Sequence, residues 1–220
     1  MINDNDIAIV NKICKSIGGP ISEKEVLFLY ELAKDVKNGV IVEIGAAQGR
    51  STICLAMGSK AGNRVRVYSI DPHAGSMYTP DPDWMGSNDP CKSGIPDIRY
   101  YTGQGKDKKL FLDNIKKWDV EDIVIPIIDY SELAYSHGLN GQEWSLDIGL
   151  LWIDGDHRFN YVKLDINLWA KHLISGGTIV MHDYPFPGVC GAIKELVLNN
   201  PRYINFRGVG VDPIVNFKVK

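Results

Sequence analysis

Five short runs rich in valine and isoleucine, separated by segments with helical spacing, constrain the fold of this sequence more than any other feature. The runs occupy residues 40–44, 66–70, 123–127, 148–153 and 178–181. Apolar runs of this length suit strands that are buried on both faces of a parallel sheet. Because parallel strands need long crossover connections, we predict an α/β fold with a doubly wound, mostly parallel sheet and helices on both faces.

The segments around these runs carry the signals of helices and of a hairpin. We predict helices at residues 51–57, 106–117, 161–173 and 192–199, and an earlier helix that starts at a capping box of Ser22 and Glu25. Residues 203–208 and 213–219 follow each other closely and predict an antiparallel hairpin at one edge of the sheet. We interpret residues 1–220 as a single domain with N-terminal helices over residues 1–39.

One connection is unusually long. Residues 72–106 are rich in Pro, Gly, Asp and aromatic residues, and they leave from the carboxyl end of a predicted strand. A loop of that length in a compact domain is more often functional than idle, and ligands bind at this edge of open parallel sheets. We therefore predict a substrate-binding or lid insertion here, with a plain surface insertion as the alternative.

Charge and composition argue against several classes of function. The net charge is -3 with both signs interspersed, so no basic stripe indicates nucleic acid as a partner. The apolar runs fall short of the roughly 20 residues that a membrane span needs, and the N-terminus is acidic where a secretory leader would be basic. The scattered cysteines predict reduced thiols and a cytoplasmic protein, and the formation of a homo-oligomer is left open.

Two glycines follow the first run. Gly45 and Gly49 let the backbone turn tightly and approach a ligand. Their spacing matches neither the dinucleotide fingerprint G-x-G-x-x-G nor a phosphate-binding P-loop. Glu43, just before the turn, would repel a phosphate and favour a ligand with a cationic amine. Asp71, at the end of the next run, can accept hydrogen bonds from both hydroxyls of a ribose.

This turn resembles the first motif of class I S-adenosylmethionine-dependent methyltransferases, and Asp71 is similar to their ribose-binding acid. The resemblance implies a Rossmann-like methyltransferase fold, with the methionine part of the cofactor on the turn and the adenine beyond the third run. The cofactor-binding residues implied in this way are Glu43, Gly45, Ala47, Gly49, Ser51, Asp71, Asp129, Ser131 and Asp154.

The second half of the sequence narrows the resemblance. The blocks I-D-G-D-H at residues 153–157 and G-G-T-I-V-M-H-D-Y at residues 176–184 resemble the branch with macrocin-type sugar O-methyltransferases and cephalosporin-hydroxylase-like proteins. This likeness implies O-methylation of a small hydroxylated acceptor, such as a sugar or a related metabolite. It also implies a divalent metal at Asp154, His182 and Asp183, with Asp156 as the base. The sequence departs from the family by having His182 where an acid can stand.

The same two blocks have a physical meaning of their own. Asp154 and Asp183 each lie just past the carboxyl end of a predicted buried strand, so the polar side chains of the two blocks should meet at one edge of the sheet. The residues concerned are Asp154, Asp156, His157, His182 and Asp183. Crowded carboxylates raise each other's cost of ionisation, and a divalent cation such as Mg²⁺ or Mn²⁺ would relieve it. We predict that Asp156 or His157 takes the proton of the acceptor, unless the histidines only order the strand ends.

Two other functions compete with the methyltransferase. An oxidoreductase with a nucleotide cofactor uses a related fold, but the glycine spacing disfavours it. A non-catalytic module that only binds the cofactor would have no use for so many acids and imidazoles at one edge. The sequence leaves the acceptor and the attacked atom undefined.

Overall fold

The computed structural model of the chain describes residues 2–74, 106–139, 141–209 and 214–220. The predicted insertion therefore lies almost wholly outside the described residues. The strands are β1 (Val40–Ile44), β2 (Val67–Ile70), β3 (Val124–Ile127), β4 (Ile148–Ile153), β5 (Leu173–Met181), β6 (Tyr203–Val209) and β7 (Ile214–Val219). The helices are α1 (Asp4–Ser16), α2 (Glu23–Asp35), α3 (Arg50–Ala61), α4 (Lys106–Lys117), α5 (Ser131–His137), α6 (Phe159–Trp169) and α7 (Pro187–Ile193), followed by a π-helical turn at Lys194–Leu198.

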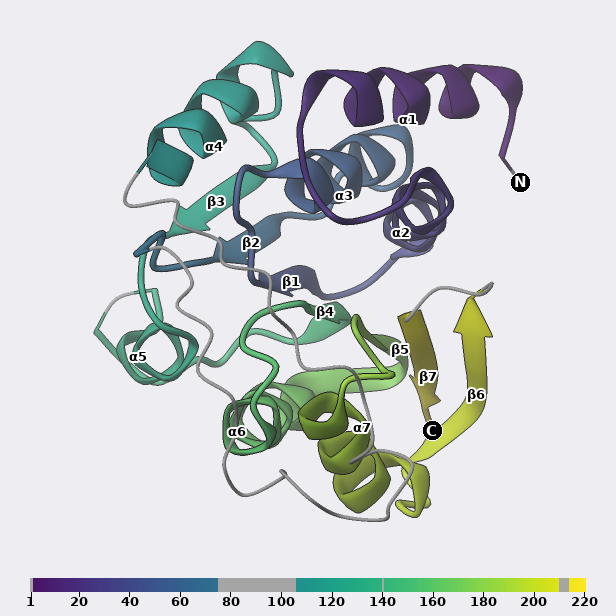
Figure 1. Cartoon of the computed structure of the whole chain (residues 1–220), viewed down its shortest axis with the longest axis vertical. Coiled ribbons are helices and arrows are strands. Elements are labelled where there is room, and N and C mark those ends of the chain that lie inside the picture. The colour runs from purple at the N-terminus through teal and green to yellow at the C-terminus, as the bar shows by residue number, and fades with distance from the viewer. Residues whose placement is uncertain (1, 75–105, 140, 210–213) are drawn as a thin grey trace.

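The strands form one seven-stranded sheet in the order β3-β2-β1-β4-β5-β7-β6 (Figure 1). Strands β1 to β5 pair in parallel, whereas β7 runs antiparallel to both β5 and β6. The chain first builds outward from β1 to β3 and then continues on the other side of β1. The predicted fold class, a doubly wound and mostly parallel sheet with an antiparallel hairpin at one edge, is confirmed.

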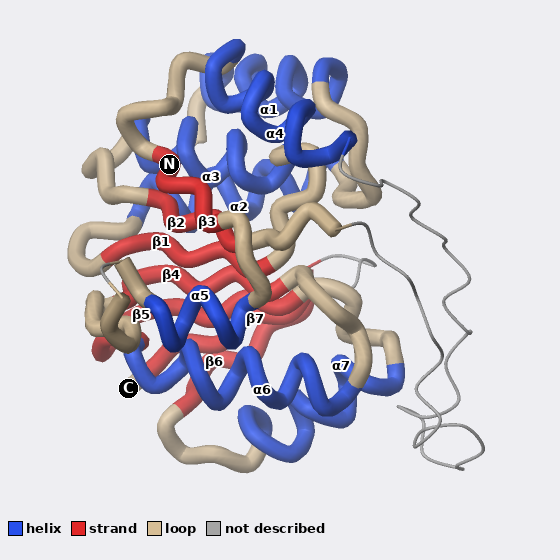
Figure 2. Tube along the Cα trace, turned by 90° about the vertical axis from the view of Figure 1, so that its left-hand side faces the viewer, coloured by secondary structure: helices blue, strands red, loops and turns tan. Residues whose placement is uncertain are grey.

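Helices cover both faces of this sheet. Helices α1 to α4 lie over one face and α5 to α7 over the other (Figure 1, Figure 2). Alternate residues of β4 point to the two sides: Leu150 and Trp152 pack with the first group of helices, and Leu151 and Ile153 pack with the second. All four side chains are buried, which explains why the strand reads as a continuous apolar run.

Strand β5 is longer than predicted because the chain re-enters the sheet early. Helix α6 ends at Trp169, and β5 begins at Leu173 rather than at Thr178. The register shifts after the pair of Leu173 with Ile148, and Gly176 has a φ of +78°. A left-handed glycine inside a strand is typical of a bulge. The apolar residues before the bulge have the spacing of a continuing helix, which is why the sequence predicted one there.

The N-terminal helices are fixed to the rest of the fold through α3. The predicted capping box starts α2, with Ser22 N donating to Glu25 Oε2 at 2.6 Å. Gly58 of α3 lets the two helices touch, because a Cβ there would lie 2.4 Å from Tyr30 O. Arg50, the first residue of α3, donates to four backbone carbonyls within residues 14–21. The segment that leads into α2 is thus held by the helix that follows the glycine turn.

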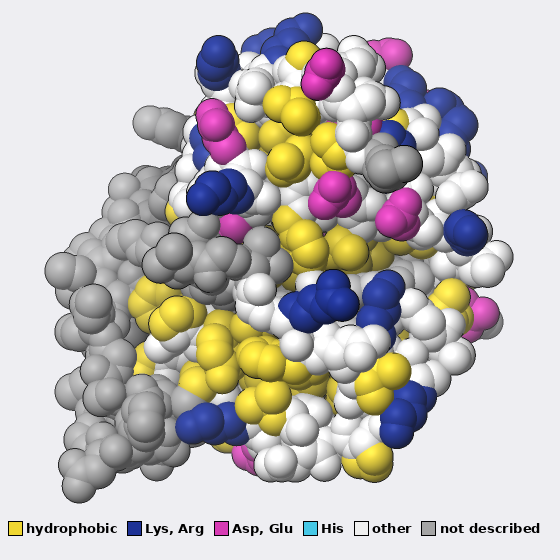
Figure 3. Space-filling model, turned by 90° about the vertical axis from the view of Figure 1, so that its right-hand side faces the viewer, with side chains coloured by type: hydrophobic (Ala, Val, Ile, Leu, Met, Phe, Trp, Pro, Cys, Tyr) yellow, Lys and Arg dark blue, Asp and Glu magenta, His cyan; other side chains and the backbone are white. Residues whose placement is uncertain are grey.

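The surface carries charges of both signs, as the sequence predicted (Figure 3). On the face in Figure 3, Lys and Arg side chains are dispersed among Asp and Glu, with apolar side chains exposed between them. Among the described helices, none is both long and apolar enough to cross a membrane. Cys14 and Cys54 are free thiols, but Cys190 is disulfide-bonded, so the prediction of reduced cysteines is wrong for that residue.

Candidate active site

All predicted site residues except Asp129 and Ser131 lie on or just after four adjacent strands, near the carboxyl edge of the sheet. Ile44 of β1 pairs with Ile70 of β2 and with Ile153 of β4, and Ile153 pairs with Met181 of β5. The strand order reverses between β1 and β4, and this crevice is where open α/β sheets bind ligands. The glycine turn, Asp71, the I-D-G-D-H block and the H-D-Y block are therefore brought together at one edge, as the sequence predicted.

The glycine turn after β1 needs both of its glycines. Gly45 has a φ of +89°, and a Cβ there would lie 2.1 Å from the carbonyl oxygen of Asp154. Gly49 has a φ of +91° and precedes α3, where a Cβ would lie 3.0 Å from the Phe111 ring. Ala47 between them is exposed with a φ of +45°. The turn thus passes close to the end of β4 and presents its backbone at the edge of the sheet.

Asp71 is tied to this turn. Its Oδ2 accepts from the backbone N–H groups of Ala46 and Ala47 at 2.8 and 2.9 Å, and its Oδ1 accepts from His73 N at 2.6 Å. The carboxylate therefore sits beside the turn in a fixed orientation. The structure brings together the two features that the sequence assigned to one cofactor.

Glu43 lies beneath the turn and is completely buried. Its carboxylate accepts hydrogen bonds from the hydroxyls of Ser51, Thr52 and Ser69 at 2.5–2.6 Å. Burial raises the pKa of Glu43 to about 7, although the three hydroxyls oppose the shift. The side chain supports the turn from within the protein, and so does Ser51. Burial leaves Glu43 no open side with which to face a cationic amine, which corrects our expectation for this residue.

Asp129 and Ser131 lie where α5 begins, beyond β3. The carboxylate of Asp129 accepts from Tyr130 N at 2.9 Å and remains partly exposed. Ser131 instead turns toward α6, where its hydroxyl accepts from Trp169 Nε1 at 2.8 Å. It also bonds to Asp165, whose pKa burial raises to about 7. A contact of either residue with adenine stays a prediction.

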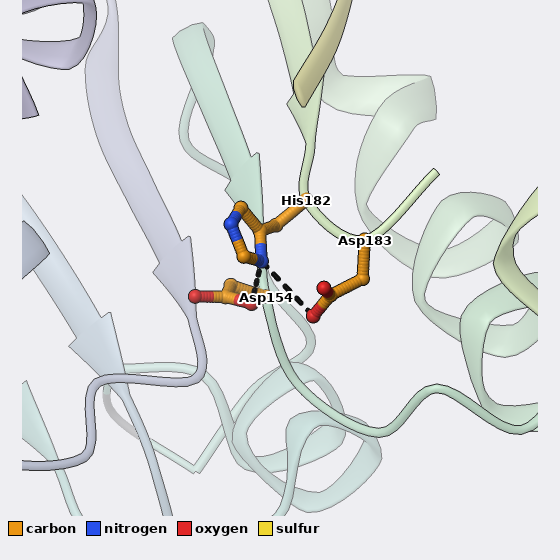
Figure 4. A group of neighbouring side chains, drawn as sticks. All are labelled: Asp154, His182 and Asp183. Atoms are coloured by element: carbon orange, nitrogen blue, oxygen red, sulfur yellow. Dashed lines mark ion pairs between the residues drawn. The ribbon is translucent and has the colours of Figure 1, made fainter. Parts of the chain in front are cut away.

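The acids and imidazoles after β4 and β5 form a compact group, which we call the acid–imidazole cluster. Its members are Glu25, Asp154, His157, His182 and Asp183. Three of them converge from the two strand ends in Figure 4, where His182 Nδ1 lies 3.1 Å from Asp154 Oδ1 and 2.9 Å from Asp183 Oδ2. His157 Nε2 lies 2.9 Å from the same oxygen of Asp183. Asp183 itself has a φ of +56°, a strained value of the kind that occurs at functional sites.

Glu25 is the member that sequence reasoning missed. It belongs to α2, is 2% exposed, and places Oε1 3.0 Å from Nε2 of His182. Its other oxygen, Oε2, accepts from Ser22 N in the capping box. The capping box was a clear signal in the sequence, but it predicted only a helix start. Glu25 and His182 are 157 positions apart in the sequence, and nothing in that separation indicated their contact.

One cation offsets part of the negative charge inside this cluster. Burial alone would lower the pKa of His182, but Asp154, Asp183 and Glu25 outweigh it and raise that pKa to about 12. Burial would likewise raise the pKa of Asp183, yet the imidazoles of His157 and His182 beside it hold that pKa well below its usual range. His182 is therefore an imidazolium among carboxylates. The positive charge of His182 offsets part of the repulsion between the carboxylates, which was the reason for expecting a metal from the sequence.

The two residues predicted as bases have different surroundings. His157 stacks on Phe186 with ring centroids 5.3 Å apart and planes 7° apart. Asp156 is paired with Arg158, whose Nε lies 3.0 Å from both carboxylate oxygens and whose Nη2 lies 2.5 Å from Oδ2. The guanidinium of Arg158 thus engages both oxygens of the Asp156 carboxylate. His157, paired with an ionised carboxylate, is better suited to accept a proton.

Comparison with known families agrees with this geometry. Residues 42–184 match the family model described as a methyltransferase domain. This match covers more than half of the chain, and the chain belongs to that methyltransferase family.

Individual relatives are more distant. The uncharacterized protein R132 of Acanthamoeba polyphaga mimivirus is 32% identical over 90 residues, which make up 39% of this chain and 35% of that protein. The chain thus matches about a third of that relative's length. The structure of the O-methyltransferase NovP has a TM-score of 0.68 at 15% identity, over 90% of this chain and 81% of NovP. The O-methyltransferase from Bacillus cereus in complex with SAH has a TM-score of 0.64 at 18% identity, over 100% of this chain and 93% of that chain. These two likenesses establish the fold.

Proposed function

We propose that this chain transfers the methyl group of S-adenosylmethionine to a hydroxyl oxygen of a small acceptor, such as a sugar or a related metabolite. The observation that carries the proposal is the meeting, at one sheet edge, of a glycine turn tied to Asp71 and a histidine paired with Asp183. We further propose that residues 1–220 form one domain. A small-molecule partner, rather than nucleic acid or a membrane, and a cytoplasmic location stay predictions from charge and composition.

The turn fits a sulfonium amino-acid cofactor better than a nucleotide with phosphates. Arg50 is the basic residue of the turn segment, and its guanidinium is engaged with backbone carbonyls rather than free for a phosphate. In our proposal the backbone of Gly45, Ala47 and Gly49 holds the methionine part, and Asp71 holds the ribose. The NADH-type oxidoreductase is disfavoured by the same arrangement.

The chemistry asks little of the protein beyond alignment and proton removal. The methyl group of a sulfonium is already activated, so the acceptor oxygen has to lie in line with it and lose its proton. We assign the proton to His157, because Asp183 beside it stays ionised and can stabilise the imidazolium that forms. Asp156, which the family resemblance implied as the base, instead positions Arg158 in this proposal.

A divalent cation, Mg²⁺ or Mn²⁺, is the second element of the proposal. One ligand atom each from Asp154, His182 and Asp183 lies within 4.8 Å of the others. Among the described residues, Nδ1 of the buried His182 has no well-aligned hydrogen-bond partner, although two carboxylate oxygens are near. Two acids and an imidazole suit either ion. When bound, the cation would act as a Lewis acid that lowers the pKa of an acceptor hydroxyl, and it would compete with the proton on His182.

The test combines binding and turnover. Calorimetry should detect binding of S-adenosylhomocysteine and not of NADH, and release of S-adenosylhomocysteine in a screen of hydroxylated small molecules should identify an acceptor. With that acceptor, His157→Asn should lower turnover about 100- to 10,000-fold at unchanged cofactor affinity, while Asp156→Asn, the neighbouring control, should lower it less than about tenfold. Tight binding of NADH would contradict the methyltransferase, and full activity in EDTA would remove the metal from the proposal.

A further inference from the structure

His73 has a backbone conformation that is uncommon for residues other than glycine. It is the second residue after Asp71, and its φ of +48° lies in the left-handed region that favours glycine. Its backbone N–H donates to Asp71 Oδ1 at 2.6 Å and closes a tight turn on that carboxylate. A strained backbone conformation therefore occurs two residues after Asp71, the acid that binds the ribose in the proposed function.

The imidazole of His73 is buried, and none of the described residues forms a hydrogen bond with it. Its side chain is 1% exposed, and the ring packs on Phe111 of α4 with centroids 4.8 Å apart. Within the described part of the chain, neither ring nitrogen makes a hydrogen bond. Nδ1 lies 3.8 Å from Asp71 Oδ1, which is too far for one. Burial lowers the pKa of this ring although Asp71 and Asp107 oppose the shift, so the imidazole is neutral and keeps both a donor and an acceptor.

A packing role does not account for these observations. Phenylalanine would fill the same place against Phe111 and would bury no polar atom. Buried polar groups in folded proteins are nearly always hydrogen-bonded, so an exception needs a reason. Residues whose conformation or unpaired polar atoms lower stability are found mostly at binding and catalytic sites. At His73 the strained backbone and the unpaired ring occur in one residue, next to Asp71.

We infer that His73 is a second ribose-binding residue, an inference that rests on the proposed use of S-adenosylmethionine. A ribose hydroxyl that donates to Asp71 Oδ1 can also accept from an N–H at Nδ1 of His73. The ligand then supplies the hydrogen-bond partner that the described residues do not. The group recognised in this way is the cis-diol of an adenosine.

The test compares cofactor affinity with stability. His73→Phe removes both ring nitrogens and keeps an aromatic contact with Phe111, and His172→Phe is the control at a histidine outside the site. His73→Phe should unfold at the same or a higher urea concentration than the wild type, but bind S-adenosylhomocysteine about tenfold more weakly in calorimetry. The 2′-deoxy and 3′-deoxy forms of this ligand identify the contact, because toward one of them the wild type and His73→Phe should bind equally.

Each result decides a separate question. Equal affinity of the wild type and His73→Phe for S-adenosylhomocysteine would overturn the inference, and so would a loss of affinity that persists with both deoxy ligands. A wild-type protein that binds no S-adenosylhomocysteine would overturn the proposed function itself, and the inference with it. If His73→Phe does not fold, the same ligand series with His73→Leu gives the answer.

Discussion

The two halves of the sheet edge satisfy their carboxylates in different ways. At the ends of β1 and β2, Glu43 accepts from three hydroxyls and Asp71 accepts from backbone amides. At the ends of β4 and β5, Asp154 and Asp183 face imidazole rings. In the first half, neutral hydroxyl and amide groups donate to the carboxylates. In the second half, the carboxylates are stabilised by imidazole rings, one of which is positively charged.

In the proposed function, the half with neutral donors binds the cofactor and the half with paired ions removes the proton of the acceptor. Neutral donors fix the position of the turn and of Asp71 without adding charge, which suits a cradle that has to keep one shape. Paired ions make the acid–imidazole cluster sensitive to the loss of any member, because removing one partner leaves the others buried and unpaired. The three predictions that follow test this contrast, beginning with the largest effect.

His182→Phe should be the most destabilising of these changes. The substitution leaves Glu25, Asp154 and Asp183 without their common cation, and breaking a buried ion pair costs about 3–5 kcal/mol. Urea unfolding at pH 7 measures the loss, with His172→Phe as the control outside the cluster. The loss should shrink toward pH 4, where carboxylates take up protons. A variant as stable as the control would mean that the cluster is not held together by charge.

Glu43→Gln tests the half that is held by neutral donors. The pKa of Glu43 is raised to about 7 from its ordinary 4.5, so the folded protein binds the extra proton between these values and loses stability as pH rises through them. Relative to Glu43→Gln, the wild type should lose at most about 3 kcal/mol between pH 5 and pH 8. Exposed Glu31→Gln is the control in the same unfolding series. Parallel pH curves for the wild type and Glu43→Gln would show that the carboxylate is ionised throughout.

Glu25→Gln should have the smallest effect and defines how far the cluster extends. Both oxygens of Glu25 accept, one from Ser22 N and the other from His182. Glutamine has one acceptor, so one of these donors loses its partner at a cost of about 1–2 kcal/mol. Glu23→Gln, exposed in the same helical turn, controls for the lost charge at the helix start. Equal unfolding midpoints for the two variants would exclude α2 from the cluster.

The sequence predicted those parts of the site that depend on local pattern. Apolar runs predicted the parallel strands, and in such a sheet the residues after each strand must share an edge, so the meeting of Asp154, His157, His182 and Asp183 followed. The role of Glu43 could also have been found. Strand alternation puts it on the same face as Ile41, under α3, and not at the open edge.

Contacts between distant segments could not be predicted in this way. Nothing in the spacing of Glu25 and His182 relates a helix start to a strand end, because their contact depends on how α2 packs against α3. The pairing of Asp156 with Arg158 is local, but a side-chain rotamer decides it. The bulge in β5 was missed for a similar reason, since the register of a neighbouring strand sets it.

The hydrogen bonds of Arg50 to the carbonyls of residues 14–21 connect the stretch that matches the family to the residues before it. Similarity to the family starts at residue 42, yet the first side chain of α3 reaches back across that boundary to four carbonyls. Glu25, which touches His182, lies in the helix that follows those carbonyls. A chain trimmed to the recognisable stretch would lose both. The stretch by which the family is recognised therefore leaves out a side chain of the acid–imidazole cluster and the backbone that Arg50 binds.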